Sequence, residues 1–210
     1  HTAGYPMVSI YFTAQEVWNM FEVVSLLAEM RGDIFFIQVS GANYHYNPGH
    51  SMWLKIPVLG IPIPSYRGLK KVEIFEGRGV QHQGPFRELD PAEDRLYHIV
   101  ADHYLTSFLP LVGQVLPRLA ITLRDQHGQP IAIDSTIIRH ASGQEFKVWE
   151  ALARYAASFE TAGTYDLPVL PDYYRETQGR VVQLSGIPLW VWSYSLLILL
   201  LAGIAWLSLR

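Results

Sequence analysis

The stretch Glu88–Leu111, ELDPAEDRLYHIVADHYLTSFLPL, organises the rest of the chain. Asp90-Pro91 predicts a turn, because proline fixes its own φ and keeps the preceding residue out of the helical region. Residues 95–101 are rich in β-forming side chains, which predicts a short buried strand. The strand ends in the polar pair Asp102-His103. Polar residues at the carboxyl end of an α/β strand often line a ligand crevice; a strand that runs into a capped helix explains the pair equally well.

Length, charge and cysteine content narrow the class of protein. The chain has 210 residues, 50% of them hydrophobic, and a formal net charge of −3. These values exclude a largely disordered chain and a basic nucleic-acid-binding surface, so no nucleic-acid partner is expected. The absence of cysteine excludes disulfides, thiolate zinc sites and cysteine nucleophiles. Because the chain starts at His1 without a leader-like segment, we expect it to be a piece of a longer protein whose upstream partner is absent.

The segment 187–209 contains no charged residue. As a helix it would be about 34 Å long at about 1.5 Å per residue, which is enough to cross a bilayer core. Aromatic residues stand near both of its ends, as in interfacial belts: Trp190, Trp192, Tyr194 and Trp206. We therefore expect a single transmembrane helix, with a buried core helix as the alternative. Arg210 follows the segment and Arg175 and Arg180 precede it, so the positive charges hardly decide its orientation.

The amino-terminal part predicts a strand and then a capped helix. Residues 6–12 alternate and include β-branched side chains, which predicts a strand. Thr13 and Glu16 have the spacing of a capping box, in which each side chain bonds the backbone of the other residue. The helix is expected to end near Met30. Its predicted apolar face consists of Val17, Met20, Phe21, Val24, Leu27 and Ala28.

Further strands and one further amphipathic helix are expected along the chain. The predicted strands cover 34–40, 41–47, 69–76 and 119–123, and the helix covers 144–159. The inner stripe of that helix is expected to consist of Phe146, Trp149, Leu152, Ala153, Ala156 and Phe159. Residues 48–68 are apolar and proline-rich without periodicity. This insertion is expected either on the membrane or a partner surface, or packed against its own domain.

These elements predict an α/β fold with a mixed α+β sheet and flanking helices, followed by the transmembrane helix. Three parts are expected: residues 1–162 as the α/β domain, residues 163–186 as a stalk rich in proline and tyrosine, and residues 187–209 as the membrane span. The partner expected for the last part is the lipid bilayer.

Three stretches, in this order and spacing, resemble the C-terminal domain of the 5'-nucleotidase family. They are Gly4–Val17, Phe35–Pro48 (FFIQVSGANYHYNP) and Leu89–Leu105. In that family, which includes periplasmic UDP-sugar hydrolases, the domain follows a metallophosphatase domain. The resemblance implies that this chain recognises the substrate for such a domain upstream. It also implies a soluble domain on the extracytoplasmic, periplasmic side of the cell membrane.

The chain departs from the family pattern at the expected ligand loop. The family has Asn-Asp and then Gly-Gly-Asp-Gly-Phe, whose aromatic ring stacks on the nucleobase. Here Asp102-His103 precede the loop Ser107–Val112, which lacks those glycines and the loop acid. Phe108 is the candidate to replace the family's aromatic residue. By resemblance, Phe108, Tyr104 and Asp102 are the expected substrate-binding residues, and the expected ligand is a nucleotide or a related phosphate ester.

The chemistry of ester hydrolysis is not expected in this chain. In the family, a pair of divalent metal ions held in the other domain activates the attacking water. The histidines here are scattered without ligand spacing, and a metal site at His98 and His103 is disfavoured. We therefore expect no cofactor, no metal site and no catalytic residue in the chain, which alone should be inactive. The alternative hypothesis is a non-catalytic, membrane-tethered binding or interaction module derived from the same domain, using the insertion at 52–66.

Overall fold

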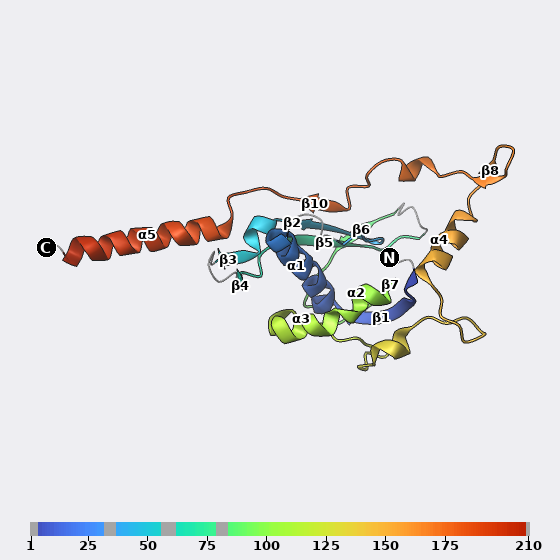
Figure 1. The fold of residues 1–210 in the computed structure, drawn as a ribbon, viewed down its shortest axis with the longest axis horizontal. Coiled ribbons are helices and arrows are strands. Elements are labelled where there is room, and N and C mark those ends of the chain that lie inside the picture. Colours follow the sequence, from blue (N-terminus) through green and yellow to red (C-terminus); the bar gives the residue numbers. More distant parts are fainter. Residues whose placement is uncertain (1–3, 32–36, 56–61, 79–83, 209–210) are drawn as a thin grey trace. The chain divides into compact units, whose positions relative to one another are not determined.

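The computed structural model describes residues 4–31, 37–55, 62–78 and 84–208, and it shows a mixed α/β fold (Figure 1). Two compact units share the chain. The first unit takes residues 1–19 and 90–178, and the second takes residues 20–89 and 179–210. Both the start of the chain and its middle therefore contribute to the first unit. The three-part division expected from the sequence stays a prediction.

The first unit is built on a pair of antiparallel strands. β1 (Met7–Thr13) pairs with β7 (Leu96–Asp102), with Met7 opposite Asp102 and Thr13 opposite Leu96. Both strands were predicted, but β7 is less buried than expected, and Val100 is 47% exposed. The reason is that an antiparallel pair such as β1–β7 can pack one face on the core and leave the other exposed, so alternate side chains of β7 face away from the core. Among the described residues β7 pairs only with the antiparallel β1, so its carboxyl end does not lie at the edge of a parallel sheet, where crevices of the α/β type form.

Short helices and loops complete the first unit. They are α2 (His103–Ser107), α3 (Leu109–Val115), η4 (Pro117–Leu119), η5 (Ile133–Thr136), α4 (Val148–Ala156), the hairpin β8 (Thr161–Ala162) and β9 (Leu167–Pro168), and η6 (Asp172–Tyr174). The predicted strand at 119–123 is wrong. Its residues alternate in burial, but the backbone N–H of Thr122 donates to Oε1 of Glu16 at 3.0 Å instead of to a neighbouring strand.

Helix α4 is shorter than predicted and faces a different way. The backbone of Phe146 pairs with Met7 and Ile138 in extended structure, so the helix cannot begin before Val148. The side chain of Glu150 then accepts a hydrogen bond from the backbone N–H of Lys147 at 3.1 Å. The predicted inner stripe is therefore wrong, because Trp149 is 55% exposed and Leu152 is also exposed.

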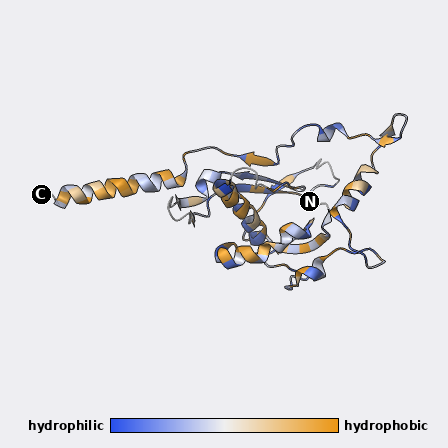
Figure 2. Ribbon diagram, viewed as in Figure 1, coloured by the Kyte–Doolittle hydropathy of each residue, from blue (hydrophilic) through white to orange (hydrophobic). Residues whose placement is uncertain are grey.

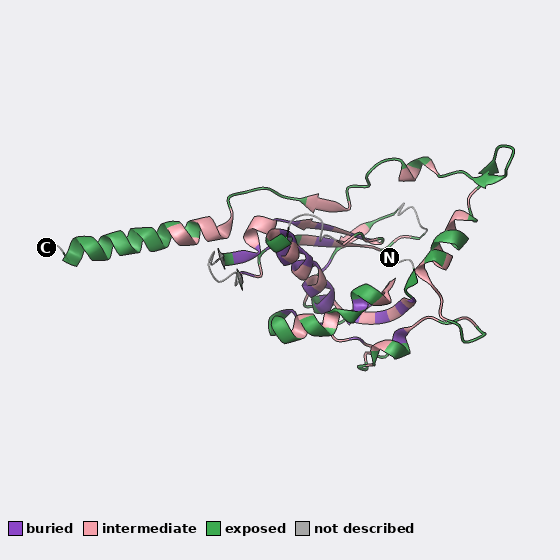
Figure 3. Cartoon of the chain, in the orientation of Figure 1, coloured by how far each residue is buried: buried purple, intermediate pink, exposed green. Residues whose placement is uncertain are grey.

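Helix α1 (Ala14–Arg31) contributes residues 14–19 to the first unit and residues 20–31 to the second. Its capping box is confirmed, because Thr13 N donates to Glu16 Oε2 at 2.9 Å and Glu16 N donates to Thr13 Oγ1 at 3.2 Å. The predicted apolar face is confirmed only in part. Met20 and Leu27 are half-buried, whereas Leu26 and several polar side chains are buried (Figure 3).

The second unit contains a four-stranded sheet of order β10-β2-β5-β6. Its strands are β2 (Ala42–Tyr46), β5 (Leu69–Phe75), β6 (Phe86–Glu88) and β10 (Val181–Gln183). β10 runs parallel to β2, and the other two pairs are antiparallel. The aromatic ring of Phe21 on α1 lies 4.6 Å from that of Tyr44, which packs in turn on Tyr46. The core of this unit therefore lies between α1 and the sheet. Part of the segment expected as a stalk forms its edge strand.

One predicted strand before this sheet is wrong over its described residues. Residues 34–36 lie outside the described part of the chain, and residues 37–40 form no strand. Their carbonyls accept side-chain donors: Ile37 O from Tyr44 Oη at 3.0 Å and Val39 O from Arg180 Nη1 at 2.9 Å. Because those acceptors are occupied, this segment does not join the ladder.

The insertion at 48–68 holds elements that its sequence pattern did not predict. η3 (Pro48–His50) is followed by β3 (Met52–Lys55), which pairs antiparallel with β4 (Pro62–Pro64). Residues 56–61 lie outside the described part of the chain. Both η3 and β3 contact α5 (Leu189–Ser208). The insertion is therefore packed, at least along η3 and β3, on its own unit.

Helix α5 is strongly apolar; its first turns are mostly half-buried, and it is exposed from Ser195 to Ser208 (Figure 2, Figure 3). By length and composition it can cross a membrane, and none of its residues is buried. This exposure does not fit a buried core helix, which was the alternative expected from the sequence.

Candidate functional site

Three aromatic side chains of the first unit form a cluster, here called the aromatic cluster: Tyr5, Tyr104 and Phe108. The ring centroids of Tyr5 and Tyr104 are 5.2 Å apart. Those of Tyr104 and Phe108 are 4.9 Å apart, with the rings edge to face. All three side chains are exposed, Phe108 by 44%. The cluster therefore presents aromatic carbon to the surroundings of the unit.

The strand pair and a helix cap position this cluster. Because Met7 lies opposite Asp102 in the β1–β7 register, Tyr5 and Tyr104 lie two residues further on, beside each other. Asp102 is the N-cap of α2, and its Oδ1 accepts the backbone N–H of Leu105 at 2.9 Å. The buried Thr106 adds a bond from Oγ1 to the Asp102 carbonyl at 2.9 Å. The cap thus fixes the start of the helix that carries Tyr104.

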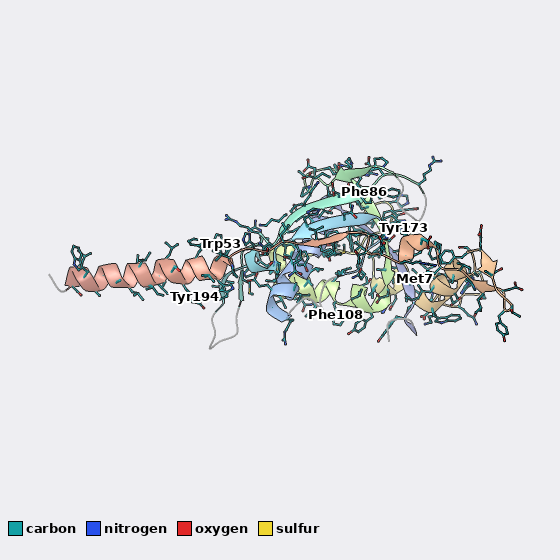
Figure 4. The ribbon with its side chains drawn as sticks, turned by 90° about the horizontal axis from the view of Figure 1, so that it is seen from above. Met7, Trp53, Phe86, Phe108, Tyr173 and Tyr194 are labelled. Atoms are coloured by element: carbon teal, nitrogen blue, oxygen red, sulfur yellow. The ribbon has the colours of Figure 1, made fainter. Side chains whose placement is uncertain are left out.

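The structure brings together two of the three residues predicted from the sequence. Tyr104 and Phe108 are in contact (Figure 4 labels Phe108 in this unit), whereas one carboxylate oxygen of Asp102 is bonded within α2. Sequence reasoning missed Tyr5, because its contact with Tyr104 depends on a strand register that joins distant parts of the chain. The substrate-binding role of all three predicted residues stays a prediction.

Exposed aliphatic side chains extend the aromatic cluster along α2 and α3. Leu105, Leu111 and Val115 are all exposed. They add exposed apolar side chains to both short helices beside the aromatic cluster. Such a surface is typical of a ligand or protein contact.

The histidines near β7 serve the strand pair. His98 Nε2 is hydrogen-bonded to Ser9 Oγ at 2.8 Å, and its ring stacks on Tyr11 with centroids 4.7 Å apart. His103 donates its backbone N–H to Pro6 O at 2.9 Å, which continues the β1–β7 ladder. Within the described ranges, no group of three His, Cys, Asp or Glu residues is placed to hold a metal ion.

A second group of polar residues was not predicted: a stripe along α1 made of Glu16, Asn19, Glu22, Ser25 and Glu29, here called the polar stripe. In the first unit, Glu16 accepts hydrogen bonds from the guanidinium of Arg124 at 3.2 and 3.3 Å. Asn19 donates to Ala120 O at 3.2 Å. Burial alone would raise the pKa of Glu16, but the bonds from Arg124, Thr13 and Thr122 outweigh it and lower that pKa.

In the second unit the polar stripe bonds to loops near the sheet. Glu22, which is 2% exposed, accepts the backbone N–H groups of Gly68 at 2.8 Å and Leu69 at 2.9 Å. Ser25 is hydrogen-bonded to Ser51 at 2.7 Å, and Glu29 accepts the Ser51 N–H at 2.9 Å. These carboxylates satisfy backbone donors that would otherwise be buried without partners. The stripe therefore has a structural role in this unit.

One open groove of about 450 Å³ lies in the second unit, where the chain leads into α5. Residues 47–49, 183–186 and Pro188 line it. His50 lies at its border, and burial and the charge of Lys70 lower the pKa of His50 despite its bond to the Ile187 backbone. Its lining offers backbone groups, the side-chain amides of Asn47 and Gln183, and the hydroxyl of Ser185, with no acidic or basic side chain among these residues.

Comparisons with known proteins find similarity among solved structures and none among sequences. The sequence matches no protein-family model and no curated protein sequence. Among solved structures, the chain is similar to the crystal structure of the 5'-nucleotidase precursor from Thermus thermophilus, with a TM-score of 0.45 and 17% sequence identity. The likeness covers 87% of this chain and 26% of that one, so the chain spans about a quarter of the length of its structural neighbour.

Proposed function

We propose that this chain is the substrate-recognition part of a membrane-anchored phosphoesterase related to the C-terminal domain of the 5'-nucleotidase family. In this proposal Tyr104 and Phe108 stack on the planar group of a nucleotide or a related phosphate ester. Asp102 acts as a positioning residue, because it caps the helix that carries Tyr104. Helix α5 anchors the chain in the cell membrane, with the folded part on the extracytoplasmic, periplasmic side.

The single observation that carries the proposal is the aromatic cluster. An exposed aromatic ring costs solvation free energy unless it has a partner, and any nucleobase offers a flat π face to such a ring. The two rings stand edge to face and are held by a capped helix, so little side-chain freedom is lost when a base stacks on them. The sequence resemblance over Leu89–Leu105 supports the same position for the ligand.

Hydrolysis itself is assigned to a companion metallophosphatase domain upstream. That domain would hold the divalent metal pair, because the described residues of this chain offer no group of ligands for an ion. This chain would bind and orient the ester, and the metal pair would activate water for attack on phosphorus. Purified alone with magnesium or manganese, the chain should release no phosphate from a nucleotide. Release of phosphate would overturn this assignment.

The proposal is tested by isothermal calorimetry on the full chain in detergent micelles, with adenosine and AMP as probes. Removing one stacking ring costs about 1–3 kcal/mol per base, so Phe108→Ala should weaken binding about 5- to 150-fold. Trp149→Ala is the matched control, because Trp149 is an exposed aromatic residue of the same unit outside the aromatic cluster. Binding that survives Phe108→Ala and Tyr104→Ala unchanged would contradict the proposal.

A second function is favoured by the aliphatic extension of the same surface. Leu105, Leu111 and Val115 add apolar area that a nucleotide would not cover. These residues fit a membrane-tethered interaction module that binds a protein through α2 and α3. No heat with any nucleoside or nucleotide, together with no effect of Phe108→Ala, would favour this alternative.

A further inference from the structure

The hairpin β3–β4 lies next to the N-terminal turns of α5. Helix α5 contacts both β3 and η3. The approach of η3 is close, because a Cβ added to Gly49 would come within 3.3 Å of Pro188 Cα. Figure 4 shows Trp53 of β3 beside the first turns of α5, where Tyr194 also lies. The hairpin is therefore fixed next to the point where α5 begins.

Two large apolar side chains of this hairpin are exposed. Trp53 is 39% exposed and Ile63 is 45% exposed, whereas Met52 at the start of β3 is buried. Helix α5 carries Trp190 and Tyr194 in its first turns, with ring centroids 5.9 Å apart. Tryptophan and tyrosine favour the interface between headgroups and hydrocarbon. The hairpin thus continues the aromatic belt of α5 onto the folded part of the second unit.

Cations lie beside these apolar side chains. The guanidinium carbon of Arg67 is 4.7 Å from the ring centroid of Trp53. Burial and the nearby charge of Arg67 lower the pKa of Lys70, although the negative charge of Glu22 acts to raise it. Within the described part of the chain, neither Arg67 nor Lys70 forms an ion pair with a carboxylate. In a protein with a net charge of −3, this pair of neighbouring cations can bind an external anion.

A short connection holds this surface near the end of α5. Six peptide steps separate Gln183, the last residue of β10, from Leu189, the first residue of α5. At about 3.5 Å per residue, such a segment reaches at most about 20 Å. If α5 enters a bilayer, the second unit therefore stays within reach of the headgroups of that leaflet.

We propose that the juxtamembrane face, made of Trp53, Ile63, Arg67 and Lys70, binds the anionic headgroup region of the bilayer that α5 enters. This inference rests on the membrane anchoring in the proposed function. The side chains of Trp53 and Ile63 enter the interface, and the two cations contact lipid phosphates. The occupant is lipid, because the face adjoins the first turns of α5 and joins interfacial apolar residues with two exposed cations.

The absence of cysteine makes site-specific spin labelling direct. Ile63→Cys, Leu199→Cys and Tyr165→Cys would be labelled singly in the full chain, in nanodiscs containing phosphatidylcholine and phosphatidylglycerol. Collision with water-soluble nickel ethylenediaminediacetate and with oxygen reports the depth of each label. Tyr165, which is 84% exposed, gives the aqueous reference, and Leu199 in the middle of α5 gives the span reference. The label at 63 should be shielded from nickel to an intermediate degree.

The outcomes separate this inference from the anchoring. A label at 63 that is as accessible as the label at 165, with the label at 199 still shielded, overturns the inference and leaves the anchoring intact. A label at 199 that is as accessible as the label at 165 overturns both. Intermediate shielding at 63 supports the juxtamembrane face.

The role of charge is tested with Arg67→Gln/Lys70→Gln in the Ile63→Cys background. Each cation near an anionic surface favours the membrane-bound position about 5-fold. Removing both should therefore lower the ratio of chains with this face on the bilayer to chains with it in water about 30-fold. The matched control is Arg118→Gln/Arg154→Gln, which removes two exposed arginines of the first unit, including Arg154, whose guanidinium lies 5.0 Å from the Phe146 ring. Pure phosphatidylcholine should mimic the first variant. Equal behaviour of the two variants would overturn binding to anionic lipid.

Discussion

An ordinary amphipathic helix buries its apolar side chains and exposes its polar ones. Helix α1 departs from this pattern because it buries polar side chains, and helix α5 departs from it because it exposes apolar ones. α1 is buried along most of its length although it carries Glu16, Asn19, Glu22 and Ser25 among its buried residues. α5 is strongly apolar, yet none of its residues is buried and Ser195–Ser208 are all exposed. In α1 each of these buried polar side chains has a hydrogen-bond partner, which makes its burial tolerable in water. In α5 no polar partner is needed if the solvent is lipid. In this chain, the burial of a helix therefore depends on the hydrogen-bond and packing partners of its side chains, and not on its hydropathy alone.

The largest expected effect concerns Glu22 on α1. Glu22→Leu would leave the backbone donors of Gly68 and Leu69 buried without an acceptor, at about 1–3 kcal/mol for each donor. We expect a loss of about 2–6 kcal/mol, measured by urea unfolding of the full chain in detergent micelles with tryptophan fluorescence. Glu22→Gln keeps one acceptor oxygen and should lose less. Equal stability of the leucine and wild-type chains would show that the polar stripe does not stabilise the second unit.

The opposite helix is tested by placing a charge in its middle. Leu199→Arg should disfavour membrane insertion by about 2.5–3.5 kcal/mol, because a charged side chain at the centre of a span is costly. The fraction of chain that resists carbonate extraction from membranes measures this change. Folding of the second unit in detergent should be unaffected, since Leu199 is exposed. Tyr165→Arg, at an exposed site outside α5, is the control, and unchanged insertion of Leu199→Arg would contradict a membrane span.

Two glycine substitutions sharpen the contrast. A Cβ at Gly68 would lie 2.0 Å from Ser51 Oγ and 2.2 Å from Ser25 Oγ, whereas a Cβ at Gly203 of α5 meets nothing within 4 Å. Gly68→Ala should therefore cost about 1–3 kcal/mol, and Gly203→Ala should be neutral or favour the helix by about 0.5–1 kcal/mol. In a Ser25→Ala/Ser51→Ala background the cost of Gly68→Ala should fall. An unchanged cost there would mean that the clash is not with these hydroxyls.

The smallest effect is the part of the pH dependence of stability that Glu16 of α1 contributes. The pKa of Glu16 is lower in the folded chain than its ordinary value of 4.5. The contribution of Glu16 is therefore fully present above that value and is lost as the pH falls through the folded pKa. Glu16→Gln should flatten the loss of stability in acid, measured by thermal unfolding at neutral pH and below about pH 4. A loss of stability in acid that is as steep in Glu16→Gln as in the wild type would contradict this role. Helix α5 has no acidic or basic residue and should contribute no such pH dependence.

The sequence predicted those elements whose determinants are local. β1, the capping box at Thr13, α1, β2, β5 and β7 follow from alternation, helix periodicity or a cap, which neighbouring residues specify. The long apolar helix α5 follows from composition alone. The prediction of a strand at 119–123 was wrong because the backbone N–H of Thr122 donates to the carboxylate of the distant Glu16. The predicted buried face of α4 was wrong because the backbone of Phe146 pairs with Met7 in extended structure.

The candidate site was predicted in part for the same reason. Tyr104 and Phe108 are close in sequence, so a short helix brings them together. Tyr5 joins them only through the register of β1 and β7. The polar stripe was missed because a pattern of glutamates on a helix ordinarily indicates a solvated face. Only the tertiary structure shows that loops such as Gly68–Leu69 supply the donors that bury these side chains.

Strand β10 also has a mechanical consequence. It runs parallel to β2 at the edge of the four-stranded sheet, and the next regular element along the chain is α5. Tension applied through α5 would load the hydrogen bonds of β10 along the strand, so that they resist together in shear and do not open one after another. If α5 is held in a membrane, a force that pulls the sheet away from that membrane would therefore load the β10–β2 pairing before the rest of the sheet.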